Sequence, residues 1–286
     1  MNNYEKLEGM VAATFTPLDE NGDVNLSVID KYADWIASTP IKGVFVCGTT
    51  GEFSSLAIDE RKLILEKWLV SARKRFKVIA HVGSNCQRSA MELARHAAQV
   101  GADAIASIAP SFFKPGTVDE LVDFFAPICH SAAGLPFYYY NMPSITGVNL
   151  PVDKFLVEGK KKIPNLVGTK FTHNNLMEMG VCIELEQHRF EVLHGYDEIL
   201  ISGLAMGAVA GVGSTYNYIP NVYQAIFDSM KMNDLETARH NQIKSIRTVE
   251  VIIKYGGGVR GGKAIMKLIG CLLYTSPSPR DRTRSR

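Results

Sequence analysis

Short apolar runs alternate along the chain with segments that carry one apolar stripe. The runs are almost continuous in apolar residues, which is typical of strands in a parallel sheet covered on both faces. Eight runs are predicted to be strands: Met10–Phe15, Gly43–Cys47, Lys77–Val82, Ala104–Ile108, Phe137–Tyr140, Leu166–Phe171, Phe190–His194 and Ala208–Val212.

The segments between the runs show the 3.6-residue period of helices packed on a core. The stripes are Ile29, Tyr32, Ala33, Ile36; Leu65, Trp68, Leu69, Ala72; and Ala90, Leu93, Ala94, Ala97. Thr117 and Glu120 have the spacing of a capping box that opens the fourth helix. The repeated strand–helix unit predicts an α/β protein, and the number of units favours a (β/α)8 TIM barrel over an open doubly wound sheet.

Two further helical patterns, near Asp234–Lys254 and Gly261–Leu272, predict extra C-terminal helices after the barrel. No low-complexity linker divides residues 1–273, so we expect a single domain there. Residues 274–286 are a Ser/Pro/Arg string without an apolar period, and we expect them to be a disordered, non-native tail on a truncated last helix. A genuine basic disordered tail is the alternative.

Composition narrows the class of protein. The chain is 46% hydrophobic and 21% charged, as in a globular enzyme with a large core. The tail carries four arginines and one aspartate, a net of +3, so removing it from the formal +2 leaves −1. Nothing therefore points to a nucleic-acid partner. No apolar run approaches the roughly 18 residues of a membrane span, and no signal peptide is visible, so we expect a cytoplasmic protein with no membrane partner.

Cysteine and histidine positions give no sign of a metal or a disulfide framework. The five cysteines have no CxxC spacing, and Cys47, Cys129 and Cys182 lie in apolar contexts, which favours buried reduced thiols. Three histidines, His81, His173 and His194, lack the spacing of metal ligands. We interpret them as structural or substrate-lining residues. We expect no metal and no cofactor.

In a barrel of this kind the active site forms where the strands end, and this rule selects Lys170. A lysine on an apolar strand bears a costly desolvated charge unless that cost serves chemistry. Burial disfavours the ammonium form of a lysine, and the neutral amine can attack a carbonyl carbon. The alternative is a lysine that points outward and caps the strand end.

Other strand ends carry weaker signals. Backbone N–H groups and hydroxyls in the Gly48–Gly51 turn could hold a carboxylate, although such turns are common. Tyr140 could relay a proton, or it could belong to the core with the aromatic residues before it. Asp197 and Glu198 open a helix, so N-terminal capping alone would explain both.

The combination is more specific than its parts. A Gly-Thr-Thr-Gly-Glu loop at 48–52, Tyr140-Asn141-Met142-Pro143 and Gly168-Thr169-Lys170 together resemble the dihydrodipicolinate synthase/N-acetylneuraminate lyase family. The resemblance covers roughly residues 7–270 and implies a pyruvate-handling class I aldolase. It implies a Schiff base on Lys170, the keto-acid carboxylate on Thr49 and Thr50, Tyr140 as proton relay, and a homotetramer.

Further positions favour the lyase branch of that family. Synthases carry an arginine for their dicarboxylic substrate where this chain has Ile145, and a tyrosine where the 109–115 segment has phenylalanines. The 195–199 and 213–217 segments resemble sialic acid lyases, which implies that the sugar tail is bound by Thr172, Gly195, Asp197, Glu198 and Ser214. The implied activity is reversible cleavage of N-acetylneuraminate to N-acetylmannosamine and pyruvate.

Three alternatives remain open at this point. They are an aldolase for another 2-keto-3-deoxy sugar acid, a 4-hydroxy-tetrahydrodipicolinate synthase, and a non-catalytic binding protein on the same fold. The presence of both Lys170 and Tyr140 argues against the last.

Overall fold

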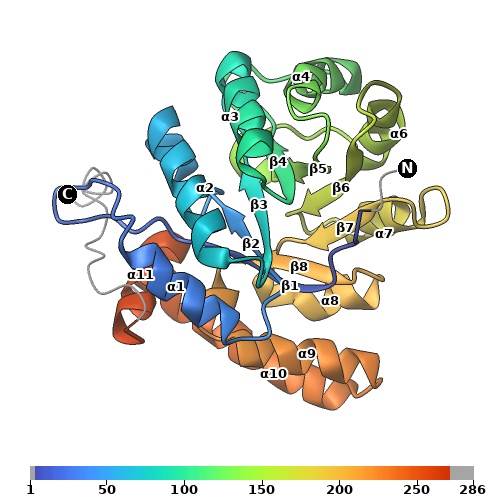
Figure 1. The fold of residues 1–286 in the computed structure, drawn as a ribbon. Helices are drawn as coiled ribbons and strands as arrows, with labels where there is room; N and C mark the ends of the chain where they lie inside the picture. Colours follow the sequence, from blue (N-terminus) through green and yellow to red (C-terminus); the bar gives the residue numbers. More distant parts are fainter. Residues whose placement is uncertain (1–3, 271–286) are drawn as a thin grey trace. The chain divides into compact units, whose positions relative to one another are not determined.

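The strands form where the near-continuous apolar runs predict them. The computed structural model describes residues 4–270. Its strands are β1 (Gly9–Ala13), β2 (Gly43–Val46), β3 (Lys77–His81), β4 (Ala104–Ile108), β5 (Phe137–Asn141), β6 (Leu166–Phe171), β7 (Glu191–His194) and β8 (Ala210–Gly213). They follow one another in sequence order in one closed barrel, which confirms the predicted (β/α)8 fold (Figure 1).

Helices occupy the segments between the strands and extend beyond the last one. They are α1 (Val28–Ala37), α2 (Ile58–Ala72), α3 (Gln87–Val100), α4 (Val118–His130), α5 (Pro143–Thr146), α6 (Val152–Lys162), α7 (Leu176–Glu184), α8 (Leu200–Ala205), α9 (Pro220–Lys231), α10 (Leu235–Lys254) and α11 (Gly257–Leu268). Three short 3-10 turns are η1 (Phe53–Ser55), η2 (Asp197–Ile199) and η3 (Thr215–Asn217). The predicted stripes of α1 and α3 are buried in full, whereas Leu69 in α2 is only half-buried.

Helix ends agree with the sequence only in part. The Thr117 hydroxyl accepts from Glu120 N at 3.2 Å, as a capping box requires. The Glu120 carboxylate, however, accepts from Gly116 N at 2.6 Å, one residue earlier than the box predicts. Helix α11 begins at Gly257, before the predicted Gly261. Glycine is a poor helix former, so Gly257 and Gly258 gave no helical signal in the sequence.

The chain divides into two compact units, each assembled from separate segments. The first unit comprises the chain up to Gly9, then Ile79–Tyr196 and Leu200–Val212. The second comprises Met10–Val78, Asp197–Ile199 and the chain from Gly213 onward. The single-domain organisation of residues 1–273 stays a prediction, and the predicted tail from residue 274 lies outside the described residues.

Strand β5 shows how the first unit builds its core. Phe137 and Tyr139 pack against Phe125 of α4 and, for Tyr139, Phe155 of α6, with ring centroids 4.6–5.5 Å apart. Successive side chains of a strand point to opposite faces, so Tyr138 and Tyr140 lie on the face away from these helices.

The second unit joins its helices through aromatic contacts and buried hydrogen bonds. Tyr32 and Trp68 meet edge to face at 5.0 Å between centroids, which joins α1 to α2. The Tyr32 hydroxyl donates to Asn217 Oδ1 at 2.5 Å and so ties α1 to the turn after β8.

The predicted thiols are confirmed: Cys47, Cys129 and Cys182 are buried and form no disulfide, while Cys86 is exposed. Cys271 lies outside the described residues. Within residues 4–270, no helix is both long and apolar enough to cross a membrane.

Candidate active site

Lys170 and Tyr140 are direct neighbours on adjacent strands of the first unit. They are register partners across β5 and β6, and their side chains are 4% and 2% exposed. The Lys170 Nζ lies 4.0 Å from the centroid of the Tyr140 ring. A buried amine over the face of a phenol ring is an arrangement in which both groups can reach the same bound molecule.

Local sequence explains why the two side chains meet. Tyr140 lies on the face of β5 that Phe137 and Tyr139 leave open, and Lys170 is its partner on that face. Gly168 lets β6 approach β7, because a Cβ atom at Gly168 would lie only 2.0 Å from the carbonyl oxygen of Glu191. A larger residue there would displace the strand that carries Lys170.

The surroundings of Tyr140 fix its ring. Its hydroxyl donates to Met142 Sδ at 3.1 Å, a weak acceptor that a substrate oxygen could replace. The His81 ring lies edge-on at 5.9 Å between centroids. The Nε2 atom of His81 accepts from Ile108 N at 3.3 Å, so the histidine is held by β4 and has a structural role.

Thr172 and Gly195 form a second contact in the same unit, just after β6 and β7. A Cβ atom at Gly195 would lie 2.0 Å from Thr172 Oγ1, so only glycine fits at this position. The Thr172 hydroxyl is buried and has no hydrogen-bond partner among the described residues. A buried hydroxyl in that condition is suited to bind a ligand group.

The Gly-Thr-Thr-Gly-Glu loop lies in the second unit, after β2. Thr49 and Thr50 are half-exposed, and the turn closes through Glu52 N, which donates to Thr49 O at 3.1 Å. The Thr16 hydroxyl donates to the Gly51 carbonyl at 2.7 Å from the end of β1. The two half-exposed hydroxyls thus lie on a turn that is held by its own backbone hydrogen bond and by the bond from Thr16.

Asp197 does more than open its own turn. Its Oδ2 atom accepts from Thr215 N at 2.8 Å and from Thr215 Oγ1 at 2.6 Å, so it caps η3 from another segment of the chain. A Cβ atom at Gly213 would lie 1.8 Å from Asp197 Oδ1, which explains the glycine there. Ser214, at the start of η3, and Glu198 are half-buried.

The predicted site residues therefore fall into two groups. The first unit holds Lys170, Tyr140, Thr172 and Gly195. The second unit holds the turn with Thr49 and Thr50, and the segments of Asp197, Glu198 and Ser214. Across the described residues, no group of His, Cys, Asp and Glu side chains could hold a metal ion.

Sequence reasoning missed two buried cations beside the Thr49–Thr50 turn. Lys263 of α11 pairs with Glu52, and Arg61 of α2 lies beside Cys47. Lys263 shares a helix face with buried Met266, three residues later. A lysine on an apolar helix face could have indicated that this cation is buried. The sequence around Arg61 gave no such indication, since arginine is equally common on the exposed face of a helix.

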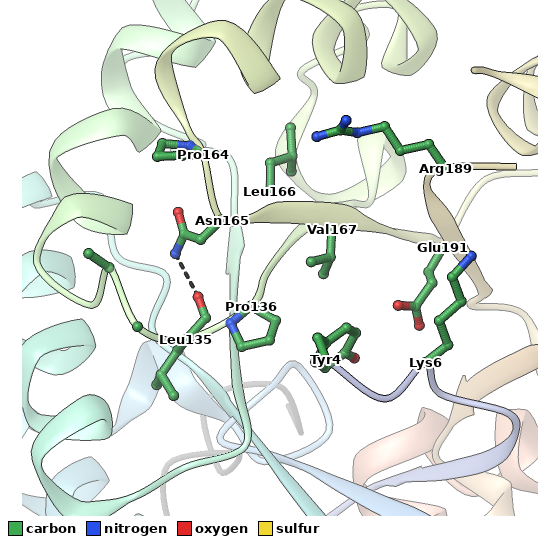
Figure 2. Close-up of a pocket in the computed structure, with 12 residues that line it drawn as sticks. Tyr4, Lys6, Leu135, Pro136, Pro164, Asn165, Leu166, Val167, Arg189 and Glu191 are labelled. Carbon is green, nitrogen blue, oxygen red and sulfur yellow. Dashed lines mark hydrogen bonds between the residues drawn. The ribbon is translucent and has the colours of Figure 1, made fainter. Parts of the chain in front are cut away.

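A cavity of about 680 Å³ lies elsewhere in the first unit, where β5, β6 and β7 begin (Figure 2). Its polar lining includes Tyr4, Lys6, Arg189 and Glu191, and none of the predicted site residues lines it. The Glu191 Oε2 atom accepts from Leu7 N at 2.9 Å and from the Tyr138 hydroxyl at 3.0 Å. Burial raises the pKa of the Glu191 carboxyl.

Comparison with known proteins supports the family suggested by these motifs. The sequence matches the family described as "Dihydrodipicolinate synthetase family" over residues 6–279. The chain belongs to the dihydrodipicolinate synthetase family.

Among curated members, it is 42% identical to the N-acetylneuraminate lyase of Mus musculus over 93% of this chain and 84% of that protein. It is 43% identical to the enzyme of the same name from Gallus gallus, over 94% and 88%.

Solved structures of the family agree with the fold. The N-acetylneuraminate lyase of Proteus mirabilis superposes with a TM-score of 0.92 at 36% identity, covering 96% of this chain and 92% of that one. A structure titled as a dihydrodipicolinate synthase (dapA) superposes with a TM-score of 0.85 at 28% identity, covering 93% and 90%. Similarity is thus greater to a lyase than to this synthase.

Proposed function

We propose that this member of the dihydrodipicolinate synthetase family is a Schiff-base aldolase that cleaves N-acetylneuraminate reversibly to N-acetylmannosamine and pyruvate. The observation that carries the proposal is the buried Lys170 amine over the Tyr140 ring. The names of its relatives support a carbon–carbon lyase with this substrate.

The proposed reaction uses Lys170 as the nucleophile. Its neutral amine adds to the C2 keto carbon, and Tyr140 gives its proton to the carbinolamine hydroxyl, which leaves as water to form a protonated imine and a Tyr140 phenolate. The phenolate accepts the proton of the C4 hydroxyl as the C3–C4 bond breaks, and the bonding electrons pass into the imine to leave an enamine. N-acetylmannosamine departs and Tyr140 protonates the enamine at C3. Water then hydrolyses the imine, with its proton returned to Tyr140, to release pyruvate and the Lys170 amine.

Substrate recognition is proposed to divide between the remaining predicted residues. The hydroxyls and N–H groups of the Thr49–Thr50 turn would hold the carboxylate of the keto acid. Thr172, whose buried hydroxyl lacks a partner among the described residues, would bind the sugar tail next to Gly195. Asp197, Glu198 and Ser214 would complete recognition of the tail.

Chemical trapping tests the proposal directly. Incubation with pyruvate and borohydride should add one reduced pyruvate adduct to the peptide that contains Lys170. Lys170→Ala should lose the adduct and nearly all turnover, since covalent catalysis has no substitute here. Lys160→Ala, which removes a half-buried lysine paired with Glu186, is the matched control and should keep both. An adduct on any other lysine would refute the assignment of the nucleophile.

A panel of keto acids tests the substrate. N-acetylneuraminate should release pyruvate faster than other 2-keto-3-deoxy sugar acids, because hydroxyl-binding sites discriminate against analogues that leave them unpaired. A preference for another sugar acid would leave the proposed mechanism in place and change only the assigned substrate.

From the family resemblance we also propose that the protein is a cytoplasmic homotetramer. Sedimentation of the purified protein would check the oligomeric state, and localisation of a tagged chain would check the compartment.

A further inference from the structure

The Thr49–Thr50 turn, which is proposed above to hold the substrate carboxylate, is bounded by two residues in an unfavourable backbone conformation. Cys47 has φ of 55° and Glu52 has φ of 59°, in the left-handed region that disfavours residues with a Cβ atom. Neither is a glycine, so contacts of their side chains must hold the turn in shape. Each of the two side chains meets a buried cation from a helix of the same unit.

Lys263 meets Glu52. Its Nζ donates to Glu52 Oε1, and the Lys263 and Glu52 side chains are 2% and 9% exposed. Two glycines before it allow α11 to approach this closely. A Cβ atom at Gly262 would lie 2.4 Å from Phe15 Cζ, and one at Gly261 would lie 2.8 Å from Ile252 Cγ2. The close packing that these glycines allow brings Lys263 of α11 into contact with Glu52 of the turn.

Arg61 meets the other end of the turn. Its guanidinium lies beside the Cys47 thiol and 5.5 Å from the centroid of the Phe53 ring. Burial raises the pKa of Cys47 to about 11, so the thiol stays protonated and does not neutralise the arginine at neutral pH. Both strained ends of the turn thus contact a buried cation.

We propose that Lys263 is a positioning residue for carboxylate binding: through its buried ion pair with Glu52 it holds the Thr49–Thr50 turn in shape. This inference rests on the proposed function of that turn. Lys263 itself need not touch the substrate. The last helix of the described chain is then part of the substrate site, and its loss would weaken binding of the keto acid before it affected chemistry at Lys170.

The test measures borohydride trapping of Lys170 as a function of pyruvate concentration. Lys263→Met removes the charge and keeps a long side chain. It should raise the half-saturating pyruvate concentration roughly tenfold and change the maximal trapping rate less than about threefold, as expected for lost binding alone. Lys263→Arg keeps the charge and should recover most of the affinity.

Two controls separate positioning from stability. Met266→Ala truncates a fully buried side chain of the same helix and should lower the melting temperature without moving the pyruvate curve. The double variant Glu52→Gln/Lys263→Met leaves no lone buried charge, so it should regain stability over Lys263→Met while the pyruvate curve stays shifted.

Three outcomes would overturn the inference. They are an unchanged pyruvate curve in Lys263→Met, an equal shift in Met266→Ala, and recovery of affinity together with stability in the double variant. If the unmodified protein is not trapped at all, the proposed function fails as well. Trapping with normal affinity in Lys263→Met would refute the positioning role alone.

Discussion

Lys170 and Tyr140 are proposed to act as a pair, and their contact suggests how they would divide the work. The Lys170 Nζ lies over the face of the Tyr140 ring, which would stabilise the positive charge of the proposed protonated imine. The Tyr140 hydroxyl donates to the Met142 sulfur, which is a weak acceptor. We therefore expect the ring to support the imine and the hydroxyl to transfer the proton.

Tyr140→Phe separates these two functions. The ring remains to pack against Lys170, so pyruvate trapping should persist at a reduced rate. Cleavage of N-acetylneuraminate should fall by about 10²–10⁴-fold because the proton acceptor is gone. Pyruvate release coupled to NADH oxidation measures the cleavage rate. Tyr139→Phe, which changes the neighbouring buried tyrosine on the helix-facing side, is the control. Equal losses of trapping and cleavage in Tyr140→Phe would contradict the relay role.

Residue-scale prediction located positions where one rule applied and failed where packing decides. The sequence placed Lys170 and Tyr140 on strands of the barrel, where the structure shows them as register partners, while their roles stay predictions. The pairing of Glu52 with Lys263 could not, since it joins residues far apart in the chain and depends on how closely α11 packs. Roles inferred from family resemblance, such as that of Ser214, remain predictions.

Asp197 and Ser214, both proposed to bind the sugar tail, differ in how far they also support the fold. The Asp197 carboxylate caps η3, while its main-chain carbonyl accepts from Gln242 Nε2 of α10 at 3.0 Å. Ser214 lies at the start of the same turn and makes no capping bond through its side chain. The two residues should therefore respond differently to substitution.

Ser214→Ala should lower kcat/KM for N-acetylneuraminate by roughly three- to tenfold, the value of one hydrogen bond, with melting temperature and pyruvate trapping unchanged. Asp197→Ala should lower both kcat/KM and the melting temperature, because the buried N–H of Thr215 loses its acceptor at a cost of about 1–3 kcal/mol. Thermal melts and steady-state kinetics check both. Full stability in Asp197→Ala would show that the cap contributes nothing.

Element prediction was strongest for strands and weakest at helix ends. The apolar runs located all strands of the barrel because both faces of a parallel sheet are covered. The capping box at Thr117 was only half right, since the Glu120 carboxylate selects Gly116 N over the residue predicted. Such a choice depends on loop geometry, which the spacing of two residues does not encode.

At the scale of the whole molecule, the repeated strand–helix unit was enough to predict a closed barrel. The division into two compact units was not predictable, because each unit combines segments distant in sequence. The hydrophobic pattern also did not predict that the N-terminal segment packs as part of the first unit. Tyr4 contacts the Tyr138 hydroxyl, and Leu7 donates to Glu191, so one buried carboxyl anchors this segment.

This anchor should make stability depend on pH in a particular direction. Burial is the largest influence on Glu191 and raises its pKa above 4.5, against the opposing effects of the bonds from Leu7 and Tyr138 and the charge of Lys6. Between pH 4.5 and the raised pKa, the unfolded chain is ionised while the folded chain keeps its proton. Stability from this group is therefore fully present below pH 4.5 and is lost as the pH rises through the raised value.

Glu191→Gln cannot ionise and removes this dependence. The free energy of unfolding of the unmodified protein, relative to Glu191→Gln, should fall from about pH 4.5 upward and then become constant once the folded carboxyl is ionised. Urea unfolding of both proteins between pH 4 and pH 8 measures the difference. Glu8→Gln, which changes an exposed carboxylate in the same segment, is the control. A difference that rises with pH would mean that the hydrogen bonds from Leu7 and Tyr138 favour the ionised carboxylate more than burial opposes it.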